Sequence, residues 1–384
     1  MLLRRTMGRV CVALAAGLFI VGLWPFSFRP VNHAGWLPDR DGLHFKPDGI
    51  AYDLELLPVP AMTSLSDQPA AFSVELWVKP DLEPDDNVFH ILTMDDGHRP
   101  SNLVLCQWES ELLLRTREDG SKRGFREVGG RGMLQMQKER FLTVTADPSG
   151  TVFYADGIQM ADMPRQMPPA CGLGGRLILG NAAEGKHPWT GQLFGLAIFS
   201  RALTAAEVAQ HHAAWTNNHA GSLTNEAGLT ALYLFDERNG SWAEDKSPNR
   251  HRIFIPPRYE VLRKIVLSAP WDDFQFGGAE LDDVVINILG FVPFGFCVFR
   301  FRRMTVKEHP LKSVLFAVAV GAVVSLSIEL IQVWLPGRSS SSTDLLCNIV
   351  GTLIGALLAG HMFAPVERRT DSGPGSDNSA TSPD

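Results

Sequence analysis

Four strongly apolar stretches divide the chain into membrane-like parts and a water-soluble part. Residues 10–24, 284–301, 313–335 and 345–363 are almost uniformly apolar, whereas residues 26–280 mix polar and apolar positions. A run of about 17–25 apolar residues is long enough to cross a bilayer as a helix. The pattern therefore predicts four transmembrane helices, with one large domain between the first and the second. The overall composition, 45% hydrophobic and 20% charged, averages over both parts.

Basic residues beside the apolar stretches predict the orientation of the helices. Clusters of them precede the first stretch, separate the second from the third and follow the fourth, whereas the loop between the third and fourth carries only Arg338. We therefore expect a multi-pass protein of a bacterial cytoplasmic (inner) membrane, with both termini cytoplasmic and residues 26–283 extracytoplasmic. The sequence FIVGLWPFSF lacks a small-residue cleavage site, which favours an uncleaved anchor over a removed signal peptide. The clusters are Arg4, Arg5 and Arg9; Arg300, Arg302, Arg303, Lys307 and Lys312; and Arg368 and Arg369.

Charge and cysteine content exclude some classes of function. The net charge is −7 and the sequence has no basic stripe with interleaved aromatic residues, so we expect no nucleic-acid partner. Of the five cysteines, Cys106 and Cys171 lie in the large domain. Outside the cytoplasm these two residues are either a disulfide or two buried free thiols. No spacing of Cys and His residues predicts a zinc site.

The large domain has the pattern of short β-strands. In AFSVELWVKP, residues 71–80, apolar and polar positions alternate, which predicts a half-buried strand. FLTVTADPSGTVFYADG predicts a hairpin, because the DPSG at residues 147–150 suits a type I turn. Thr204 and Glu207 form a capping box at the start of a helix in TAAEVAQHHAAW. The series of short strands predicts an antiparallel β-sandwich.

These segments resemble the laminin-G-like (LamG), concanavalin A-like jelly-roll family of lectins and glucanases. The resemblance rests on FSVELWVKP, FYADGIQ, LILGN, WTGQLFGLAIFSRALTAAEVAQHH and LTALYLFDERNGSWAEDKSPNRH, and it covers most of residues 43–255. It implies a two-sheet sandwich of a kind that often binds glycans or proteins, in some members with calcium. Glycosidases need two closely placed carboxylates. An E-x-D-x-x-E run, which would place such acids on one strand, is absent from the sequence.

Two groups of side chains in this domain are candidates for ligand binding. Asp236 and Asp245 lie in the turn-rich DERNGSWAED, where they are either solvated loop acids or ligands of a Ca²⁺ ion. Trp108, Trp189 and Trp242 are stacking platforms for sugar rings if they are exposed, and core residues if they are buried. The sequence implies no other cofactor.

The last three apolar stretches each carry polar or small residues on one face. Residues three or four apart lie on the same face of a helix, so Ser325, Glu329 and Gln332 share a face of the third stretch. A charged side chain at mid-bilayer costs about 2.5–3.5 kcal/mol even on the lenient insertion scale, so we expect these faces to point toward each other. Glycines four residues apart allow close approach of helices. The corresponding faces hold Asp344, Asn348, Gly351 and Gly355 on the fourth stretch, and Asn287, Gly290 and Pro293 on the second.

The membrane segments resemble the VanZ-like family. The resemblance rests on DVVINILGFVPFGF, SIELIQVWLPGRSSSSTDLLCNIVGTLIGALL and, more loosely, GLWPFSF. It covers residues 284–363 well and, with the first stretch, implies a four-helix module. The family is named for glycopeptide (teicoplanin) resistance and has no established reaction, so the resemblance implies a site rather than an activity. The matching positions are Asn287, Phe291, Pro293, Gly295, Glu329, Gln332, Arg338, Asp344, Asn348 and Gly351.

These residues allow structural and functional interpretations. Asp344 either caps the fourth helix or takes part in function. Asn348 and Gln332 either join helices by hydrogen bonds or belong to a binding site. Glu329, paired with Arg338 or protonated, is the candidate catalytic residue, because a buried acid is a costly way to join helices. The predicted polar membrane site consists of Asn287, Glu329, Gln332, Arg338, Asp344 and Asn348.

Together the patterns predict an α + β multi-domain protein in which a jelly roll is inserted after the first helix of a four-helix membrane module. We expect a cytoplasmic tip and first helix at residues 1–25, an extracytoplasmic sandwich at 26–258, a linker or interfacial helix at 259–283, three further transmembrane helices at 284–363, and a disordered cytoplasmic tail at 364–384.

We expect a non-enzymatic function, in which the sandwich binds an envelope glycan, peptidoglycan or protein and the protein acts in the cell envelope or in glycopeptide-type antibiotic resistance. The alternative is an intramembrane enzyme acting on a lipid-linked envelope precursor, with Glu329 as acid/base and Arg338 holding a phosphate. A passive adhesin with an unusual anchor is a third interpretation.

Overall fold

The chain folds as two units in the structure, which is a computed structural model. The described residues are 2–55, 71–81, 87–98, 100–118, 121, 124–166, 173–269, 278–336 and 338–363. The sandwich unit comprises Pro25–Ile265 and Gln332–Ser339, and the helical unit comprises Met1–Trp24, Val266–Ile331 and Ser340–Asp384.

The first sheet of the sandwich contains the predicted strand of residues 72–80 near its centre. The strand order is β1 (Ala34–Trp36), β2 (Leu43–Phe45), β13 (Gly191–Phe199), β4 (Phe72–Pro80), β9 (Arg140–Asp147), β10 (Gly150–Ala155) and β11 (Ile158–Pro164), and β14 (Leu229–Tyr233) also pairs with β13. The predicted hairpin is confirmed as β9–β10, with Asp147 paired to Gly150. In its turn the backbone N–H of Ser149 donates to Asp147 Oδ1 at 2.7 Å, a local bond that favours Asp at turns.

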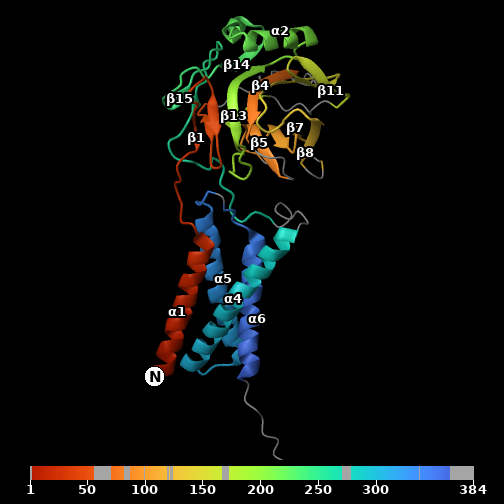
Figure 1. Cartoon of the computed structure of the whole chain (residues 1–384). Coiled ribbons are helices and arrows are strands. Elements are labelled where there is room, and N and C mark those ends of the chain that lie inside the picture. Colours follow the sequence, from red (N-terminus) through yellow and green to blue (C-terminus); the bar gives the residue numbers. More distant parts are fainter. Residues whose placement is uncertain are drawn as a thin grey trace, which may run out of the picture. The chain divides into compact units, whose positions relative to one another are not determined.

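The second sheet is built from shorter strands and faces the first (Figure 1). Its order is β15 (Trp242–Ala243), β16 (Ile253–Phe254), β3 (Ala51–Asp53), β12 (Arg176–Leu179), β5 (Val88–Asp95), β6 (Leu103–Trp108), β7 (Glu111–Arg117) and β8 (Phe125–Gly130). All of its strand pairs are antiparallel. The predicted antiparallel β-sandwich is therefore confirmed.

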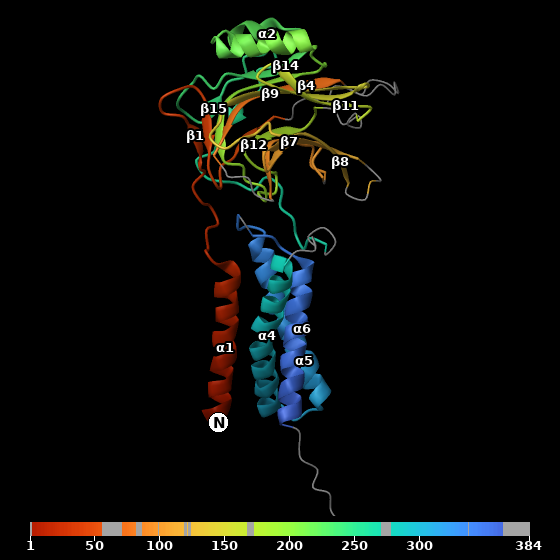
Figure 2. The same cartoon turned by 45° about the vertical axis from the view of Figure 1, so that its right-hand side comes forward.

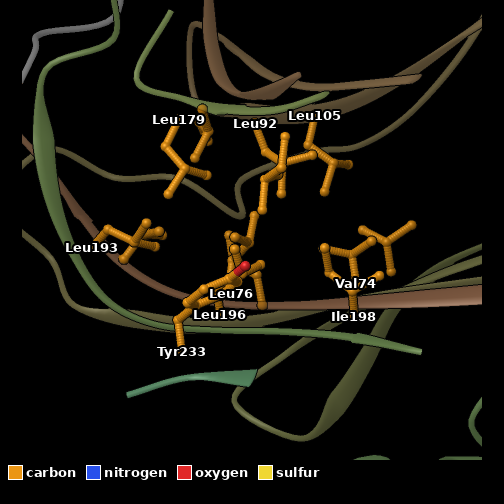
Figure 3. Packing of buried hydrophobic residues seen from close by; sticks show 14 of the residues in the cluster. Val74, Leu76, Leu92, Leu105, Leu179, Leu193, Leu196, Ile198 and Tyr233 are labelled. Carbon is orange, nitrogen blue, oxygen red and sulfur yellow. The ribbon is translucent and has the colours of Figure 1, made fainter. Parts of the chain in front are cut away.

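The core lies between the two sheets. Leu92, Leu105 and Leu179 of the second sheet face Leu76, Leu193, Leu196 and Tyr233 of the first (Figure 3). These side chains are at most 1% exposed. Because burial of apolar surface contributes about 25 cal/mol per Å², this interior is the main source of stability of the sandwich unit.

Helix α2 (Ala205–Thr216) covers the outer face of the first sheet (Figures 1 and 2). Its predicted capping box is confirmed: the Glu207 N–H donates to Thr204 Oγ1 at 3.3 Å, and the Thr204 N–H donates to Glu207 Oε2 at 2.7 Å. Val208 and Trp215 pack against residues of β9, β13 and β14. The prediction that β4 is half-buried was wrong for its first half, where both faces are buried. The alternation in the sequence marks the two faces but does not reveal that a helix covers the outer one.

The two ends of the sandwich lie side by side. Val31 and Arg258 form an antiparallel β-bridge. The buried Asn32 side chain donates to the carbonyl oxygens of Ile50 and Pro256 at 2.8 and 2.7 Å. Domains with neighbouring ends tolerate insertion into a loop of another domain. This arrangement supports the proposal that the sandwich is inserted into a membrane module.

The helical unit contains four helices that are long and apolar enough to cross a membrane. They are α1 (Leu2–Leu23), α4 (Gly278–Thr305), α5 (Pro310–Gln332) and α6 (Ser342–Met362). Each contains most of one predicted apolar stretch, so the prediction of four membrane helices is supported. Helix α1 packs against α4, and α4 packs most extensively against α6.

Glycines set the distance between α4 and α6. A Cβ atom at Gly351 would meet the carbonyl oxygen of Ile288, and one at Gly355 would meet that of Val292. On the other helix, a Cβ at Gly295 would meet the backbone of Thr352. The GxxxG pattern therefore brings the two backbones into contact, as small residues do in membrane helix pairs.

Some predictions fall partly or wholly outside the described residues. The linker has no helix over residues 259–269, and residues 270–277 are not described, so an interfacial helix there stays a prediction. The tail at 364–384 lies outside the described residues. Cys106 is a buried free cysteine whose Sγ lies 3.7 Å from the Leu113 carbonyl oxygen, whereas Cys171 is not described.

Candidate functional site

Glu329 lies in the last turn of α5 and joins that helix to the start of α6. Its side chain is buried, with 2% of the residue exposed. The backbone N–H of Ser341, the N-cap of α6, donates to Glu329 Oε2 at 2.8 Å. The Ser341 hydroxyl accepts from the Thr343 N–H in turn. A carboxylate is favoured beside the positive end of a helix dipole, so Glu329 supports the N-terminus of α6.

Asp344 lies in the first turn of α6 and contacts α4. Asn287 Nδ2 donates to Asp344 Oδ1 at 2.8 Å. The N-cap of α6 is Ser341 rather than Asp344. Asp344 still lies where the dipole favours an acid, and its hydrogen bond to Asn287 links two helices.

Asn348 lies one turn after Asp344 and connects α6 to α5. Its Nδ2 donates to Ser325 Oγ at 2.9 Å, and Ser325 is fully buried. The Asn348 side-chain oxygen is also buried and has no hydrogen-bond partner among the described residues. Polar residues of α4, α5 and α6 therefore meet inside the helical unit through hydrogen bonds. Of the face predicted for the second stretch only Asn287 takes part, because Gly290 and Pro293 are exposed.

The remaining predicted members lie at and beyond the end of α5. Gln332 is the last residue of that helix, and 8% of it is exposed. Arg338 lies in the following loop with an exposed side chain. The predicted Glu329–Arg338 ion pair stays a prediction.

The serine run before α6 forms a contact that sequence reasoning missed. Ser268, on the segment before α4, donates its N–H to the Ser340 carbonyl oxygen at 2.9 Å, and the Ser342 N–H donates to the Ser268 carbonyl oxygen at 3.1 Å. The sequence SSSST at residues 339–343 could have indicated this contact, because runs of hydroxyl residues favour helix caps and hydrogen bonds to the backbone. This pairing holds the backbone that Glu329 contacts.

The three candidate tryptophans of the sandwich differ in exposure. Trp189 is fully buried and donates its Nε1–H to Gln107 Oε1 at 2.9 Å, so it offers no ring face to a sugar. Trp108 is partly buried against the cluster formed by Val104, Cys106 and Leu113. Trp242 is half-buried on β15, and its ring centroid lies 4.8 Å from that of Phe254. Only Trp108 and Trp242 remain available for stacking.

The two candidate calcium ligands have protein partners. Asp245 is buried and accepts hydrogen bonds from the backbone N–H groups of Leu232, Ser247 and His251. Asp236 lies 2.9 Å from Lys246 Nζ. Among the described residues, no group of three or more His, Cys, Asp and Glu side chains could hold a metal ion. Asp245 therefore holds a loop together, and calcium binding by either residue stays a prediction.

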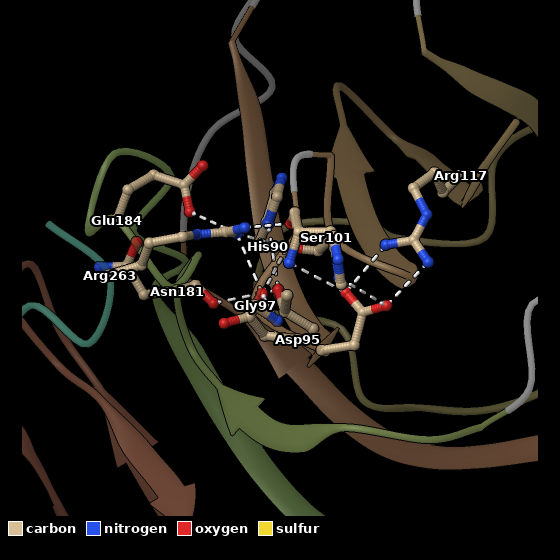
Figure 4. A network of polar contacts seen from close by, with 11 residues as sticks. His90, Asp95, Gly97, Ser101, Arg117, Asn181, Glu184 and Arg263 are labelled. Atoms are coloured by element: carbon tan, nitrogen blue, oxygen red, sulfur yellow. Dashed lines mark hydrogen bonds and ion pairs between the residues drawn. The ribbon is translucent and has the colours of Figure 1, made fainter. Parts of the chain in front are cut away.

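A buried polar network around Arg263 was missed by the sequence analysis (Figure 4). Arg263 Nη2 lies 3.1 Å from Asp95 Oδ1 and 3.2 Å from Glu184 Oε2, and it donates to Ser101 Oγ at 2.9 Å. Burial raises the pKa of Asp95, and the charge of Arg263 opposes that shift. The predicted linker is thus attached to the sandwich up to residue 263, and no local pattern in the sequence marks this long-range contact.

A second buried network lies under α2. His211 Nδ1 is 2.8 Å from Glu75 Oε1, and Trp215 Nε1 donates to Glu75 Oε2 at 3.2 Å. Glu75 is fully buried on β4. Burial disfavours the charged imidazole, but the hydrogen bonds and charges of Glu75 and Glu226 outweigh it and raise the pKa of His211.

Two family models match the chain. Residues 208–363 match the VanZ/LLP1 family, and residues 57–209 match the concanavalin A-like lectin/glucanases superfamily. The chain thus combines a VanZ-like region with a concanavalin A-like domain. Both resemblances seen in the sequence are confirmed. The VanZ/LLP1 match begins inside α2, so it includes the last strands of the sandwich as well as α4, α5 and α6.

Solved structures similar to this chain are sandwich proteins of low sequence identity. They include a proposed carbohydrate-binding protein from Bacteroides ovatus ATCC 8483 (15% identity, TM-score 0.39, 59% of this chain and 62% of that one). A heptameric SAP-like pentraxin from Limulus polyphemus has 14% identity and a TM-score of 0.34, over 47% of this chain and 80% of that one. The botulinum neurotoxin serotype D ligand-binding domain, solved with N-acetylneuraminic acid, has 14% identity and a TM-score of 0.34, over 45% of this chain and 42% of that one.

The chain therefore spans less than two thirds of the Bacteroides protein and of the neurotoxin domain. These similarities concern the fold alone. No curated protein matches the sequence significantly.

Proposed function

We propose that this protein binds a cell-envelope glycan, or a protein that carries one, through its concanavalin A-like domain, and that it catalyses no reaction. The VanZ-like region anchors it in the bacterial cytoplasmic membrane with the sandwich outside. Its role lies in envelope function or glycopeptide-type resistance. The family match of the sandwich supports the ligand class, and the three basic clusters support the orientation.

The observation that carries the non-enzymatic part is the position of Glu329. A general acid or base must come within hydrogen-bond reach of its substrate. Glu329 is 2% exposed and accepts the Ser341 N–H at the start of α6. The neighbouring pairs, Asn287 with Asp344 and Asn348 with Ser325, also link helices. This pattern matches interhelical hydrogen bonding in membrane proteins.

The surface that we assign to the glycan is the edge of the second sheet at Trp242. The rings of Trp242 and Phe254 are tilted at 40° to each other, and the Arg252 guanidinium lies over the Trp242 ring, 4.7 Å from its centroid. The Arg252 side chain is 53% exposed, and its Nη1 lies 3.8 Å from Glu244 Oε1. An aromatic face bordered by charged hydrogen-bonding groups is typical of sites that fix a polar ligand in one orientation.

The test is binding of the sandwich fragment, residues 25–265, and of the full chain in nanodiscs to peptidoglycan fragments and a glycan array. We expect binding by both, and a loss of about tenfold or more in Trp242→Ala, because buried aromatic contacts dominate such interfaces. The same binding measurement on Trp108→Ala, which alters β6 of the same sheet, shows whether the loss is specific to Trp242. Each measurement is run with calcium and with a chelator. Absence of binding by both proteins under both conditions would contradict the proposal.

Glu329→Gln tests the absence of catalysis. Gln keeps an oxygen that can accept the Ser341 N–H, so we expect normal membrane level, melting temperature and resistance phenotype. Glu329→Leu leaves that N–H buried without an acceptor, which costs about 1–3 kcal/mol and should lower the melting temperature of the detergent-solubilised protein. A Glu329→Gln variant that is stable but has no function would favour the enzyme acting on a lipid-linked precursor.

A further inference from the structure

A groove of about 950 Å³ lies between α1, α4 and α5. Gly8 and Ala16 line it on α1, Val298 and Phe301 on α4, and Val320 and Val324 on α5. On α4 and α5 the lining residues recur at a spacing of three or four, so each of these helices contributes one face, whereas α1 contributes a broader surface that includes Cys11, Val12 and Ala13. Small residues on α1 leave space that the side chains of α4 and α5 do not fill. None of the residues of the polar membrane site lines this groove.

The length of the groove corresponds to one leaflet of a membrane. Its lining on α1 extends from Arg5 to Ala16, which at 1.5 Å per residue is about 16 Å. Half of the hydrocarbon core of a bilayer is about 15 Å. The groove therefore fits an extended acyl chain from a single leaflet.

The groove is basic at one end. Arg5 and Arg9 are its charged lining residues, and both are exposed. They are four residues apart and so lie on the same face of α1. At this end of the unit, Arg302 lies 2.9 Å from the carboxylate of Glu308. The ion pairs found among the described residues do not include Arg5 or Arg9, which leaves their charge available to a ligand.

We propose that this groove binds an anionic phospholipid, with one acyl chain along α1 and the phosphate at Arg5 and Arg9. An apolar channel of one-leaflet length ending in two arginines complements a lipid with a negative headgroup, and basic pockets between membrane helices on the cytoplasmic side recognise such lipids. Arginine suits phosphate because its planar donors match the phosphate oxygens. The site is independent of glycan binding by the sandwich.

The test is native mass spectrometry of the full-length protein released from nanodiscs of phosphatidylcholine and phosphatidylglycerol. We expect retained phosphatidylglycerol on the wild-type protein. The double variant Arg5→Gln/Arg9→Gln should reduce its retention by about tenfold or more, since each basic residue near an anionic surface contributes measurably to lipid attraction. Arg4→Gln is the matched control, because Arg4 belongs to the same basic cluster without lining the groove, and it should retain the lipid.

A second pair of variants tests the apolar part without changing charge. Ala15→Phe places a large ring in the groove, and Val10→Phe adds the same ring to α1 at a position that does not line it. Ala15→Phe should lose the lipid and Val10→Phe should keep it. Equal retention of phosphatidylcholine and phosphatidylglycerol, or wild-type retention in both Arg5→Gln/Arg9→Gln and Ala15→Phe, would overturn the proposal. A dimer without retained lipid would do so as well, because a second copy would then occupy the groove.

Discussion

At the scale of single residues, the buried charges of the sandwich are held by partners far away in the sequence. Glu75 of β4 meets His211 and Trp215 of α2. The sequence pattern placed Glu75 on the outer face of a strand, where an acid normally contacts water. The helix that covers this face supplies a donor for each carboxylate oxygen, and an acid buried with such partners is tolerated.

His211 gives the sandwich a stability that depends on pH. Its pKa is raised in the folded state, so its contribution is fully present below the ordinary histidine pKa of about 6.5 and is lost as pH rises through the folded value. We expect the free energy of unfolding to fall less between pH values of about 5 and about 8 in His211→Gln than in the wild type. The measurement is urea unfolding of residues 25–265 at a series of pH values.

The matched control is His212→Gln, because His212 is the next residue of α2 and is less buried. His90 and His187 stack with centroids 4.5 Å apart, and burial lowers the pKa of both. These two histidines change the pH dependence of the free energy of unfolding in the opposite direction. The informative quantity is therefore the difference in that pH dependence between wild type and His211→Gln. An unchanged slope in His211→Gln would show that folding does not shift the pKa of His211.

At the scale of elements, contact between α4 and α6 depends on the positions of glycines. Gly351 and Gly355 are the GxxxG pair of α6, and the sequence alone predicted that this face allows close approach. The structure identifies α4 as the partner and adds Gly295 as its counterpart. The sequence could not select the partner, because the apolar stretches have similar composition and their crossing points depend on the shapes of both surfaces.

Two alanine substitutions should therefore have opposite effects on the helical unit. Gly351→Ala puts a methyl group against the Ile288 carbonyl oxygen, and such overpacking costs about 1–3 kcal/mol. Gly290→Ala on α4 meets nothing within 4 Å and should gain about 0.5–1 kcal/mol, because alanine is the better helix former. Thermal unfolding of the full chain in detergent measures both. Equal shifts of the melting temperature would contradict the close contact.

At the scale of the whole molecule, the closeness of the two ends of the sandwich supports the proposal that this domain is inserted into a membrane module. The bridge between Val31 and Arg258 brings its two ends together. After the bridge, Tyr259 is buried and accepts a hydrogen bond from Asn181 Nδ2 at 2.9 Å. Arg263 then forms ion pairs with Asp95 and Glu184. The segment predicted as a linker is thus part of the sandwich unit, which extends to Ile265.

Removal of the Arg263 side-chain charge should lower the free energy of unfolding of the sandwich unit by weakening the attachment of residues 259–265. Arg263→Met leaves Asp95 and Glu184 without their shared cation. Because 10% of the Asp95 side chain and 16% of the Glu184 side chain stay exposed to solvent, we expect a loss of about 1–3 kcal/mol rather than the full cost of a buried unpaired charge. Arg258→Met is the control, since the exposed Arg258 takes part in the bridge through its backbone, and it should change stability by less than about 0.5 kcal/mol. Urea unfolding of residues 25–265 measures both. Equal losses would argue against the network.

The sequence by itself determined the features that depend on local spacing: four apolar helices, the β9–β10 hairpin, the Thr204–Glu207 capping box and the polar faces of the membrane helices. It also located Glu329, Asn287, Asp344 and Asn348, because polar residues stand out in apolar surroundings. Only the tertiary structure decided that Trp189 is core, that Glu75 lies under a helix, and that Glu329 contacts the start of α6. These outcomes depend on which remote segment covers a given face, and packing between distant parts of the chain settles that choice.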